Sequence, residues 1–534
     1  MKTSLIALIL LCAVMMATPA SAAICESLSN LKLTNTTITS AQAVAPGAFT
    51  PPAGSGTQQP GAFTAFNALP AFCRVQGVLT PTSDSHIEFE VWLPASGWNG
   101  KYQGIGNGGF AGSIGYSNLA DAIAHNYATA STDTGHKANA IDARWALGHP
   151  EKIIDFGYRA IHETAVTAKA IIRAFYGKRP ERSYFNSCSN GGRQALMEAQ
   201  RFPEDYDGII SGAPALFWTH LNGIGIWDTL VMSDTSSYLS AGKLPAIQEA
   251  VLAECDMLDK VKDGVLEDPA RCRFDASKLN CSGTETDRCL VDPQIATLKK
   301  LYAGPRNAKG AQLAPGYAPG AEADPQGWEL WITGKQPGQG LITAFGTQFF
   351  QNMVYDNPSW DFHTFNWDRD VKVADEKLAH ILNATNPDLT QFKKRGGKLI
   401  IYHGWDDAAI PAQFAIDYYK SVLSKMGKKN ADEFVRLFMV PGMQHCAGGA
   451  GCDNFGQFTM AQGDPEHDIN AALERWVEKG IAPNKIIAAK IKTDGKPAGE
   501  VVRTHPLCPY PQVAKYKGSG SADDAANFAC AEGK

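Results

Sequence analysis

Four short apolar runs, each ending in glycine or polar residues, place the strongest constraint on the fold of this chain. Helical patterns occur between them, such as GRQALMEAQRF directly after the first run. Strands that alternate with helices and end in loops with potentially catalytic polar residues are typical of an open, mostly parallel α/β sheet with helices on both faces. We therefore predict such a sheet. The four runs are SYFNS (183–187), DGIISGAPA (207–215), KLIIYHGWDD (398–407) and FVRLFMVPGMQHC (434–446).

The first 22 residues have the pattern of a secretory signal peptide. Lys2 precedes an apolar run from Leu5 to Met16, and small residues follow up to Ala22. This pattern predicts cleavage near Ala22 or Ala23 and a secreted or periplasmic mature protein. The alternative is a short membrane anchor, although the run is too short to cross a bilayer comfortably.

The rest of the chain is too long for one hydrophobic core of ordinary size. The regular strand–helix pattern is lost between the second and third runs, where four cysteines, several aromatic residues and a Gly/Pro-rich stretch at 304–340 occur. We predict a catalytic domain built from residues 23–214 and 393–534. A lid domain at 215–392, stapled by its own disulfides, interrupts it.

The net charge indicates which binding partners are unlikely, and the cysteine content indicates an oxidising compartment. The net charge of -5 is mild for 534 residues, and no basic stripe occurs, which argues against nucleic acid and anionic membranes as partners. Of the 12 cysteines, Cys12 lies in the signal. Disulfides are expected among the others in an exported chain, and their odd number leaves at least one unpaired.

Three further segments carry weaker signals. Residues 24–75 are rich in Pro, Gly, Ala and Thr, and contain the sequence PGAFT twice, which predicts an irregular surface segment. IEFEVWLP at 87–94 alternates apolar and polar residues, as a half-buried strand does. Apolar residues at helical spacing predict a helix over 155–176 that ends at Gly177.

Three residues in these loops have the chemistry of a nucleophilic hydrolase. Ser189 follows the first run and precedes a helix, an Asp406–Asp407 pair follows the third run, and His445 follows the fourth. A serine hydroxyl becomes a good nucleophile when an imidazole removes its proton and a carboxylate orients that imidazole. In α/β-hydrolases the three arrive in the order Ser, Asp, His. The alternatives are a helix cap, an ordinary turn and a surface loop residue, but the shared order and context favour a triad.

The serine motif departs from the usual G-x-S-x-G. Ser187 stands where the first glycine belongs, and Cys188 directly precedes the candidate nucleophile. The thiol is either part of the scaffold, a separate buried group, or a nucleophile itself.

A glycine-dense loop, GNGGFAG at 106–112, is a candidate for binding the oxyanion of a tetrahedral intermediate. The backbone N–H of Asn190, just after the serine, is expected to supply one hydrogen bond. Gly108 is our choice for the other, followed by Gly109, because glycine lets the main chain approach a ligand closely. The alternative is a plain glycine turn.

An acidic stretch lies in the predicted lid. CDMLDKVKDGVLEDP (255–269) places Asp256, Asp259 and Asp263 within eight residues, and Gly264 allows a sharp turn. Oxygen ligands on a short loop suit Ca²⁺, although the spacing is not that of an EF-hand. The alternative is a solvated acidic turn.

Taken in order, CSNGGRQ, HGWDD and MQHC resemble the tannase and feruloyl esterase family, which also includes a secreted hydrolase of mono-hydroxyethyl terephthalate. The resemblance covers essentially the whole mature chain. It implies an α/β-hydrolase fold, a triad of Ser189, Asp407 and His445, and a disulfide between Cys188 and Cys446. The family usually has a small residue where Asp406 stands.

The same resemblance implies a structural calcium ion in the lid. Its ligands would be the side chains of Asp256, Asp259 and Asp263 and the carbonyl groups of Val261 and Val265. It further implies the disulfides Cys25–Cys73, Cys255–Cys272, Cys281–Cys289 and Cys508–Cys530, with Cys452 left unpaired.

These observations predict a secreted serine esterase for aromatic acid esters, first of all feruloyl (hydroxycinnamoyl) esters on plant polymers. The alternatives are a tannase that cleaves gallate esters and then a hydrolase of aromatic diacid monoesters. From a different class, a non-catalytic binding module can occupy a hydrolase fold. Four lid aromatics can either line a substrate pocket or fill a core, and core packing is the favoured interpretation: Phe217, Trp218, Phe349 and Phe350.

Overall fold

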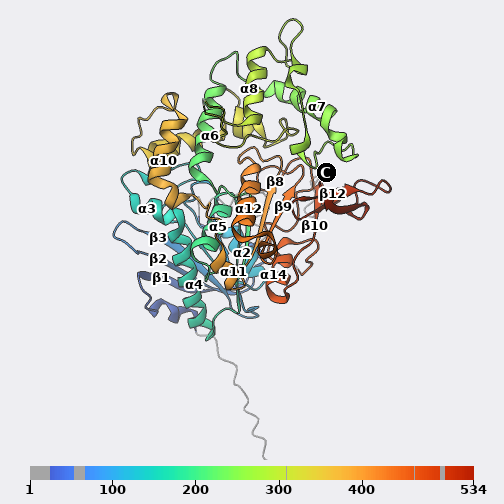
Figure 1. The fold of residues 1–534 in the computed structure, drawn as a ribbon. Helices are drawn as coiled ribbons and strands as arrows, with labels where there is room; N and C mark the ends of the chain where they lie inside the picture. The colour runs from blue at the N-terminus through green and yellow to red at the C-terminus, as the bar shows by residue number, and fades with distance from the viewer. Residues whose placement is uncertain (1–23, 53–65, 308, 462, 493–498, 534) are drawn as a thin grey trace, which may run out of the picture.

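A nine-stranded mixed sheet forms the centre of the computed structural model (Figure 1). The structure describes residues 24–52, 66–307, 309–461, 463–492 and 499–533, so the predicted signal peptide lies outside the described residues. The strand order is β1-β2-β3-β5-β4-β6-β7-β8-β9. The strands from β5 through β9 in this order are parallel, and the β1, β2 and β3 end is antiparallel. The bounds are β1 Thr36–Val44, β2 Phe72–Leu79, β3 Ile87–Pro94, β4 Lys101–Ile105, β5 Ala128–Thr132, β6 Arg182–Cys188, β7 Gly208–Gly212, β8 Lys398–Gly404 and β9 Val435–Val440.

Helices cover both faces of this sheet, as predicted. Neighbouring residues of one strand point to opposite faces, so that Ile209 packs with α4, α5 and α12, whereas Ile210 packs with α2 and α14. Both side chains are almost fully buried. The helices outside the insert are α2 Tyr116–Ala124, α3 Pro150–Ile154, α4 Ala160–Tyr176, α5 Asn190–Arg201, α11 Thr390–Lys394, α12 Gln413–Met426, α13 Lys428–Ala431 and α14 Ile469–Lys479.

The part of the chain from α6 to α10, between β7 and β8, forms a separate layer above the ends of the parallel strands (Figure 1). Within the described part of this insert the regular elements are helical, and they bury their own apolar core with Phe349, Phe350 and Leu298 at its centre. This layer lies where the predicted lid was expected. Its helices are α6 Trp218–Val231, α7 Leu244–Cys255, α8 Asp292–Ala303, α9 Leu341–Phe349 and α10 Trp367–Leu382.

Two small antiparallel hairpins follow the main sheet, near the C-terminus of the chain (Figure 1). Val261 of the insert shares a small apolar cluster with Cys508, Ala514 and Phe528 of these hairpins. The acidic stretch is therefore at a junction between the insert and the C-terminal part of the chain. The hairpin strands are β10 Ile486–Lys492, β11 Glu500–Leu507, β12 Gln512–Tyr516 and β13 Phe528–Glu532.

One prediction about the first 100 residues was wrong, and the strand predicted at 87–94 was confirmed as β3 but differs in its burial. Residues 24–75 are not simply irregular, because β1 and the start of β2 lie within them. β1 is an edge strand with mostly exposed or half-buried side chains, so it needs little apolar content. β3 is not half-buried but almost fully buried, because its neighbours and α2 cover it and Glu90 is paired with Arg74 at 2.5 Å.

The helix predicted over 155–176 begins earlier and contains an irregular turn. α3 leads into a π-helical turn at Asp155–Arg159, and α4 continues to Tyr176. Its end is as predicted: Gly177 adopts a φ of 72°, and its N–H donates to the carbonyl of Arg173 at 3.0 Å.

The structure contains five disulfides, and a buried Cys452 is the free cysteine among the described residues. Within the described residues, no helix combines the length and apolar character needed to cross a membrane. The disulfide pairs are those implied by the resemblance: Cys25–Cys73, Cys188–Cys446, Cys255–Cys272, Cys281–Cys289 and Cys508–Cys530.

Candidate active site

Ser189 lies in a sharp turn between β6 and α5. Its φ of 67° and ψ of −125° are sparsely populated for a residue with a side chain, and surrounding contacts must hold such a turn in place. The Ser189 N–H donates to the carbonyl of Gly212 at 2.9 Å, and its own carbonyl accepts from the N–H groups of Arg193 and Ala215 at 3.0 and 3.1 Å. Backbone hydrogen bonds on both sides therefore fix the serine at the sheet edge.

The two glycines after the serine are required by close packing. A Cβ atom on Gly191 would lie 1.9 Å from Ser187 Oγ, and one on Gly192 would lie 2.2 Å from the carbonyl oxygen of Gly212. Ser187 thus fills the space beside Gly191 in the position that a glycine occupies in G-x-S-x-G. The serine in place of glycine is tolerated because the residue opposite has no side chain.

His445 connects the serine to a carboxylate. The Ser189 hydroxyl lies 2.9 Å from His445 Nε2, and His445 Nδ1 lies 2.9 Å from Asp407 Oδ2. Since a carboxylate only accepts, Nδ1 carries the proton and Nε2 is free to accept from the serine. The three residues predicted from the ends of separate strands thus form one hydrogen-bonded chain, Ser189–His445–Asp407, which is called the relay below.

Four donors converge on the Asp407 carboxylate. Its Oδ1 accepts from the N–H groups of Ala409 and Ile410 at 2.8 and 2.9 Å, and its Oδ2 accepts from His445 and from His403. Burial alone would raise the pKa of Asp407, but the charge of His445 and the hydrogen bonds from both histidines outweigh burial and hold that pKa well below its usual range. Asp407 is therefore an anion throughout the working pH range.

The neighbouring carboxylate, Asp406, points elsewhere. It lies near Glu322 and Asp324 of the insert, and burial together with these two carboxylates raises the pKa of Asp406 well above its usual value. Its backbone N–H donates to the carbonyl of Met443 at 3.1 Å. The geometry thus separates two adjacent aspartates that the sequence alone leaves close to equivalent.

The disulfide between Cys188 and Cys446 joins the residue before Ser189 to the residue after His445, with Cα atoms 6.1 Å apart. It bridges a sequence separation of 258 residues. The thiol before the serine is consumed in this bond, so it acts as scaffold rather than as a free nucleophile.

The loop at 106–112 faces the serine across the site. Within the described residues no group accepts a hydrogen bond from the N–H of Gly108 or of Asn190. A Cβ on Gly108 would meet no atom within 4 Å, so this glycine borders open space. Gly109 is a glycine for a different reason, because its φ is 53° and a Cβ there would lie 2.2 Å from the carbonyl oxygen of Ala140.

Gln194, which the sequence analysis did not single out, ties this loop to the helix after the serine. Its Oε1 accepts from the Asn107 N–H at 2.9 Å, and its Nε2 donates to Asn107 Oδ1 at 3.2 Å. The Asn107 side chain also donates to the carbonyl of Thr132 at 2.8 Å. Because the Asn107 N–H is already bonded, the next peptide N–H, that of Gly108, is the one left to face the cavity.

Arg193 is a second residue that sequence reasoning missed. It is fully buried and donates to Asn190 Oδ1 and to the carbonyl of Gly157 at 2.8 Å, and to the carbonyl of Phe156 at 3.1 Å. Its guanidinium lies over the rings of Phe156 and Trp218. Burial lowers the pKa of Arg193 to about 9. The side chain links the serine turn, the π-helical turn and the first helix of the insert.

A cavity of about 1070 Å³ opens above the serine and the histidine. Trp331 and Phe345 of the insert form one wall, and the Trp331 ring meets the His445 ring edge-on with centroids 5.1 Å apart. No Asp, Glu, Lys or Arg of the described residues lines this cavity. Its lining combines several aromatic rings with glycine, serine and asparagine residues.

Only one of the four lid aromatics considered in the sequence analysis reaches this cavity. Trp218 lines it, whereas Phe349 and Phe350 are fully buried in the core of the insert. Phe217 packs between His220 and Phe414. Trp331 and Phe345 were missed because they lie in a segment without a clear period.

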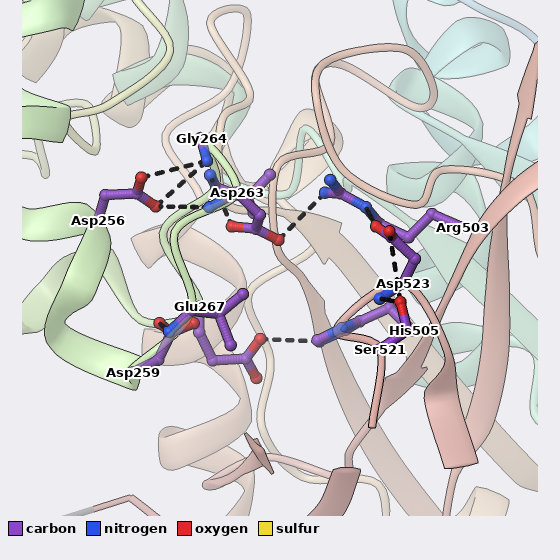
Figure 2. A network of polar contacts seen from close by, with 11 residues as sticks. Asp256, Asp259, Asp263, Gly264, Glu267, Arg503, His505, Ser521 and Asp523 are labelled. Atoms are coloured by element: carbon purple, nitrogen blue, oxygen red, sulfur yellow. Dashed lines mark hydrogen bonds and ion pairs between the residues drawn. The ribbon is translucent and has the colours of Figure 1, made fainter. Parts of the chain in front are cut away.

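The acidic loop folds around its own backbone N–H groups (Figure 2). Asp256 accepts from Gly264 at 3.2 Å, Asp259 from Val261 at 2.8 Å, and Asp263 from Val265 at 3.2 Å. These hydrogen bonds fix the fold of the loop at its junction with the C-terminal hairpins.

The oxygen donors of this loop have the chemistry that a hard divalent cation prefers, although the carboxylates of Asp256, Asp259 and Asp263 do not all lie within 4.8 Å of one another. The carbonyl oxygens of Val261 and Val265 accept no hydrogen bond from any described residue, although both residues are buried. Burial raises the pKa of Asp259 to about 6, and the neighbouring carboxylates of Asp263 and Glu267 add to this rise. Arg503 lies on the far side of Asp263, 3.1 Å from its Oδ2, and leaves Oδ1 toward the loop.

The strand order and the serine turn at the end of β6 define an α/β-hydrolase fold. Residues 73–531 match the family described as tannase and feruloyl esterase. The chain belongs to this family and is a carboxylic ester hydrolase.

Three similar proteins are esterases that align with this chain over most of their own length. The chain is 46% identical to an uncharacterized esterase of Xanthomonas campestris over 97% of this chain and 93% of the relative. It is 34% identical to the mono(2-hydroxyethyl) terephthalate hydrolase of Piscinibacter sakaiensis, over 87% and 85% of the two chains. The crystal structure of feruloyl esterase B from Aspergillus oryzae matches with a TM-score of 0.86 and 30% identity, over 95% and 99% of the two chains.

Proposed function

We propose that this protein is an exported serine esterase that hydrolyses neutral esters of aromatic acids, first of all feruloyl (hydroxycinnamoyl) esters such as those on plant polymers. One observation carries the proposal: an intact Ser189–His445–Asp407 relay opens into a cavity whose described lining contains several aromatic rings and no charged Asp, Glu, Lys or Arg side chain. A non-catalytic binding module has no need of such a relay.

The relay supports acyl transfer in two steps. Ser189 Oγ attacks the ester carbonyl while His445 Nε2 takes its proton, and Asp407 stabilises the imidazolium that forms. His445 then gives the proton to the departing alcohol, which leaves an acyl-enzyme. Water attacks this acyl group with His445 again as the base, and the aromatic acid is released as Ser189 regains its proton.

Two backbone N–H groups are candidates for binding the oxyanion. We assign this role to Asn190 and Gly108, whose N–H groups lack other acceptors within the described residues. Hydrogen bonds that strengthen as charge develops on the carbonyl oxygen lower the barrier to attack.

The residues that line the cavity suggest an order of preference among the possible substrates. Trp218, Trp331 and Phe345 offer ring surfaces for an aromatic acyl group. The free carboxylate of an aromatic diacid monoester would find no cation in this chamber, so we rank such esters below neutral ones. Gallate esters remain the second candidate, because the amide groups of Asn118 and Asn222 can meet ring hydroxyls.

We further propose that the acidic loop binds structural Ca²⁺ through the side chains of Asp256, Asp259 and Asp263 and the carbonyl groups of Val261 and Val265. When bound, the ion would neutralise the crowded carboxylates and stabilise the junction between insert and hairpins. It lies outside the cavity lining, and no reaction step passes through it.

Export is supported by two features. Residues 1–22 have the pattern of a cleaved signal peptide, and five disulfides suit an oxidising compartment. The secreted or periplasmic fraction of cells that express the whole chain would contain the protein without these residues.

The experiment compares kcat/KM for methyl ferulate, methyl gallate and mono(2-hydroxyethyl) terephthalate, with p-nitrophenyl acetate as a general ester control. We expect the order ferulate, gallate, terephthalate monoester, and loss of all four activities in Ser189→Ala. A preference for gallate would identify a tannase instead. Absence of hydrolysis with every ester would contradict the enzymatic proposal.

A further inference from the structure

A second histidine shares the carboxylate of the relay. His403 lies near the end of β8, and its side chain is completely buried. Its Nε2 lies 3.1 Å from Asp407 Oδ2, the same oxygen that faces His445, and 3.1 Å from the carbonyl oxygen of Ile410. His403 therefore contacts the same carboxylate oxygen of Asp407 as His445 does.

The surroundings of His403 determine where its proton is. Both neighbours of Nε2 are acceptors, so Nε2 must carry a hydrogen that the two oxygens share. The other ring nitrogen, Nδ1, is buried and has no hydrogen-bond partner within the described residues. A second proton on Nδ1 would be buried without an acceptor, which is costly. The geometry therefore favours the tautomer in which Nε2 carries the hydrogen and donates it to Asp407 and Ile410.

We propose that His403 is a positioning residue that sets the strength of the hydrogen bond between Asp407 and His445. The proposal rests on the serine mechanism proposed above. The two oxygens of Asp407 are held differently. Backbone N–H groups of Ala409 and Ile410 fix Oδ1, whereas Oδ2 is divided between the two histidines.

This division has two consequences for the chemistry. The His403 N–H keeps the carboxylate from rotating away from His445, which preserves the alignment of the relay. It also takes part of the negative charge of Oδ2, so that His445 holds its own proton less strongly than it would beside an unshared carboxylate.

Other titratable groups lie near the Asp407 carboxylate, and the test must distinguish their influence from that of His403. Tyr317 approaches from the insert, and its hydroxyl donates to Asp228. Asp406 is the chain neighbour, and it lies close to Glu322 and Asp324. Of these groups, Asp406 is the one next to the relay in the chain, so Asp406→Asn serves as the control variant.

The test compares two substitutions at position 403. His403→Phe keeps a ring in the buried site but removes the donor, whereas His403→Gln places an amide N–H at a similar distance from the backbone. For the Phe variant we expect kcat to fall about tenfold with little change in KM. The acid limb of its kcat/KM–pH profile should move up by about half a pH unit, because His445 then retains its proton more firmly. The Gln variant should restore the limb and most of kcat.

The measurement uses a p-nitrophenyl ester, whose ester group does not titrate, with melting temperatures recorded for every variant. If the Phe variant does not fold, His403→Asn replaces it, because an Asn amide is too short to reach Asp407 Oδ2. An acid limb that stays at the wild-type pH in the donor-free variants, or that Gln fails to restore, would overturn the proposal and leave His403 a packing residue. A limb that moves equally in Asp406→Asn would also overturn it. Persistent activity of Ser189→Ala would instead refute the serine mechanism, independently of position 403.

Discussion

The two halves of the active site are built by different means. Ser189, Asp407 and His445 each follow a parallel strand, and backbone hydrogen bonds and a disulfide hold them. The opposite wall comes from the insert, where Trp331 and Phe345 lie on short helical turns and are held by side-chain packing. We infer that the sheet half fixes the reaction and the insert half selects the substrate. Substitutions in the two halves should therefore change different kinetic parameters.

The largest effect is expected from Ser189→Ala. This change removes the attacking oxygen and very little volume, and the backbone bonds that form the turn remain. We expect kcat to fall by about four orders of magnitude or more, with an unchanged melting temperature. Residual turnover near the wild-type level, on an enzyme shown to be free of contaminating esterase, would remove Ser189 from the mechanism.

Asp407→Asn should be nearly as severe, and Asp406→Asn mild. An amide at position 407 would present an N–H group to one of the two histidines and disturb the tautomer of His445, which typically costs about 10⁴ in kcat in a serine triad. Asp406 faces Glu322 and Asp324 instead, so its replacement relieves repulsion. Steady-state kinetics of both variants decide the assignment, and a more damaging Asp406→Asn would reverse it.

The sheet half could be predicted from sequence because its signals are local. An apolar run followed by glycine marks the end of a strand, and Ser189 and His445 could be placed by counting from such ends. Asp406 and Asp407 could not be separated in this way. The choice between them depends on a turn in which Asp407 accepts from Ala409 and Ile410, and that turn has no distinctive sequence signal.

Removing the Cys188–Cys446 disulfide should have the next largest effect. The bond holds the residues beside Ser189 and His445, whose side chains must stay within hydrogen-bond reach. Replacement of both cysteines by Ala should lower kcat by about tenfold to a hundredfold, because small displacements of the relay are costly. The change also removes a long cross-link, worth on the order of 5 kcal/mol in a simple chain-entropy account and often less.

The matched control for that change lies in the insert. Cys281–Cys289 closes a separation of only 8 residues, and neither cysteine lines the cavity. The double Ala variant there should keep kcat within about twofold. Equal losses of kcat in the two double variants would show that the bridge beside the relay acts through general stability alone.

A smaller and different effect is expected in the wall formed by the insert. Trp331→Ala removes a ring that meets His445 edge-on and borders the cavity. We expect KM for methyl ferulate to rise about tenfold, whereas kcat for p-nitrophenyl acetate changes little. Trp360→Ala is the control, because this half-buried tryptophan packs on Phe350 and Tyr355 away from the cavity. Equal changes in both variants would mean that the insert responds as a whole.

The residues of the insert that line the cavity could not be predicted from the sequence, for a physical reason. Trp331 lies in a π-helical turn and Phe345 in a nine-residue helix, so neither belongs to a pattern long enough to show which face is buried. Phe350 and Trp331 are both aromatic residues in short helical segments, yet one is core and the other lines the cavity. Their positions depend on contacts between segments far apart in the chain, such as Phe110 with Phe345.

The smallest effect on chemistry, and a distinct effect on stability, is expected at the acidic loop. A chelator should lower the melting temperature of the wild-type protein by about 2–4 °C, because an ion that binds only the folded state stabilises it. Asp259→Asn and Asp263→Ala should lower it without a chelator and should abolish the response to one. Asp263 also pairs with Arg503, so Arg503→Gln is needed as a control that loses the ion pair but keeps the ligand.

The control separates the two roles of the loop. If calcium binds, Arg503→Gln still responds to the chelator, and elemental analysis finds about one calcium per chain in the wild type and none in Asp259→Asn. The value of kcat per folded enzyme should stay close to that of the wild type, since none of the loop aspartates lines the cavity. A chelator-insensitive melting curve together with no bound metal would reduce the loop to an acidic turn held by Arg503 and its own backbone. A large loss of kcat in the loop variants at an unchanged melting temperature would contradict the division between the two halves. It would mean that the insert affects the chemical step at Ser189, His445 and Asp407.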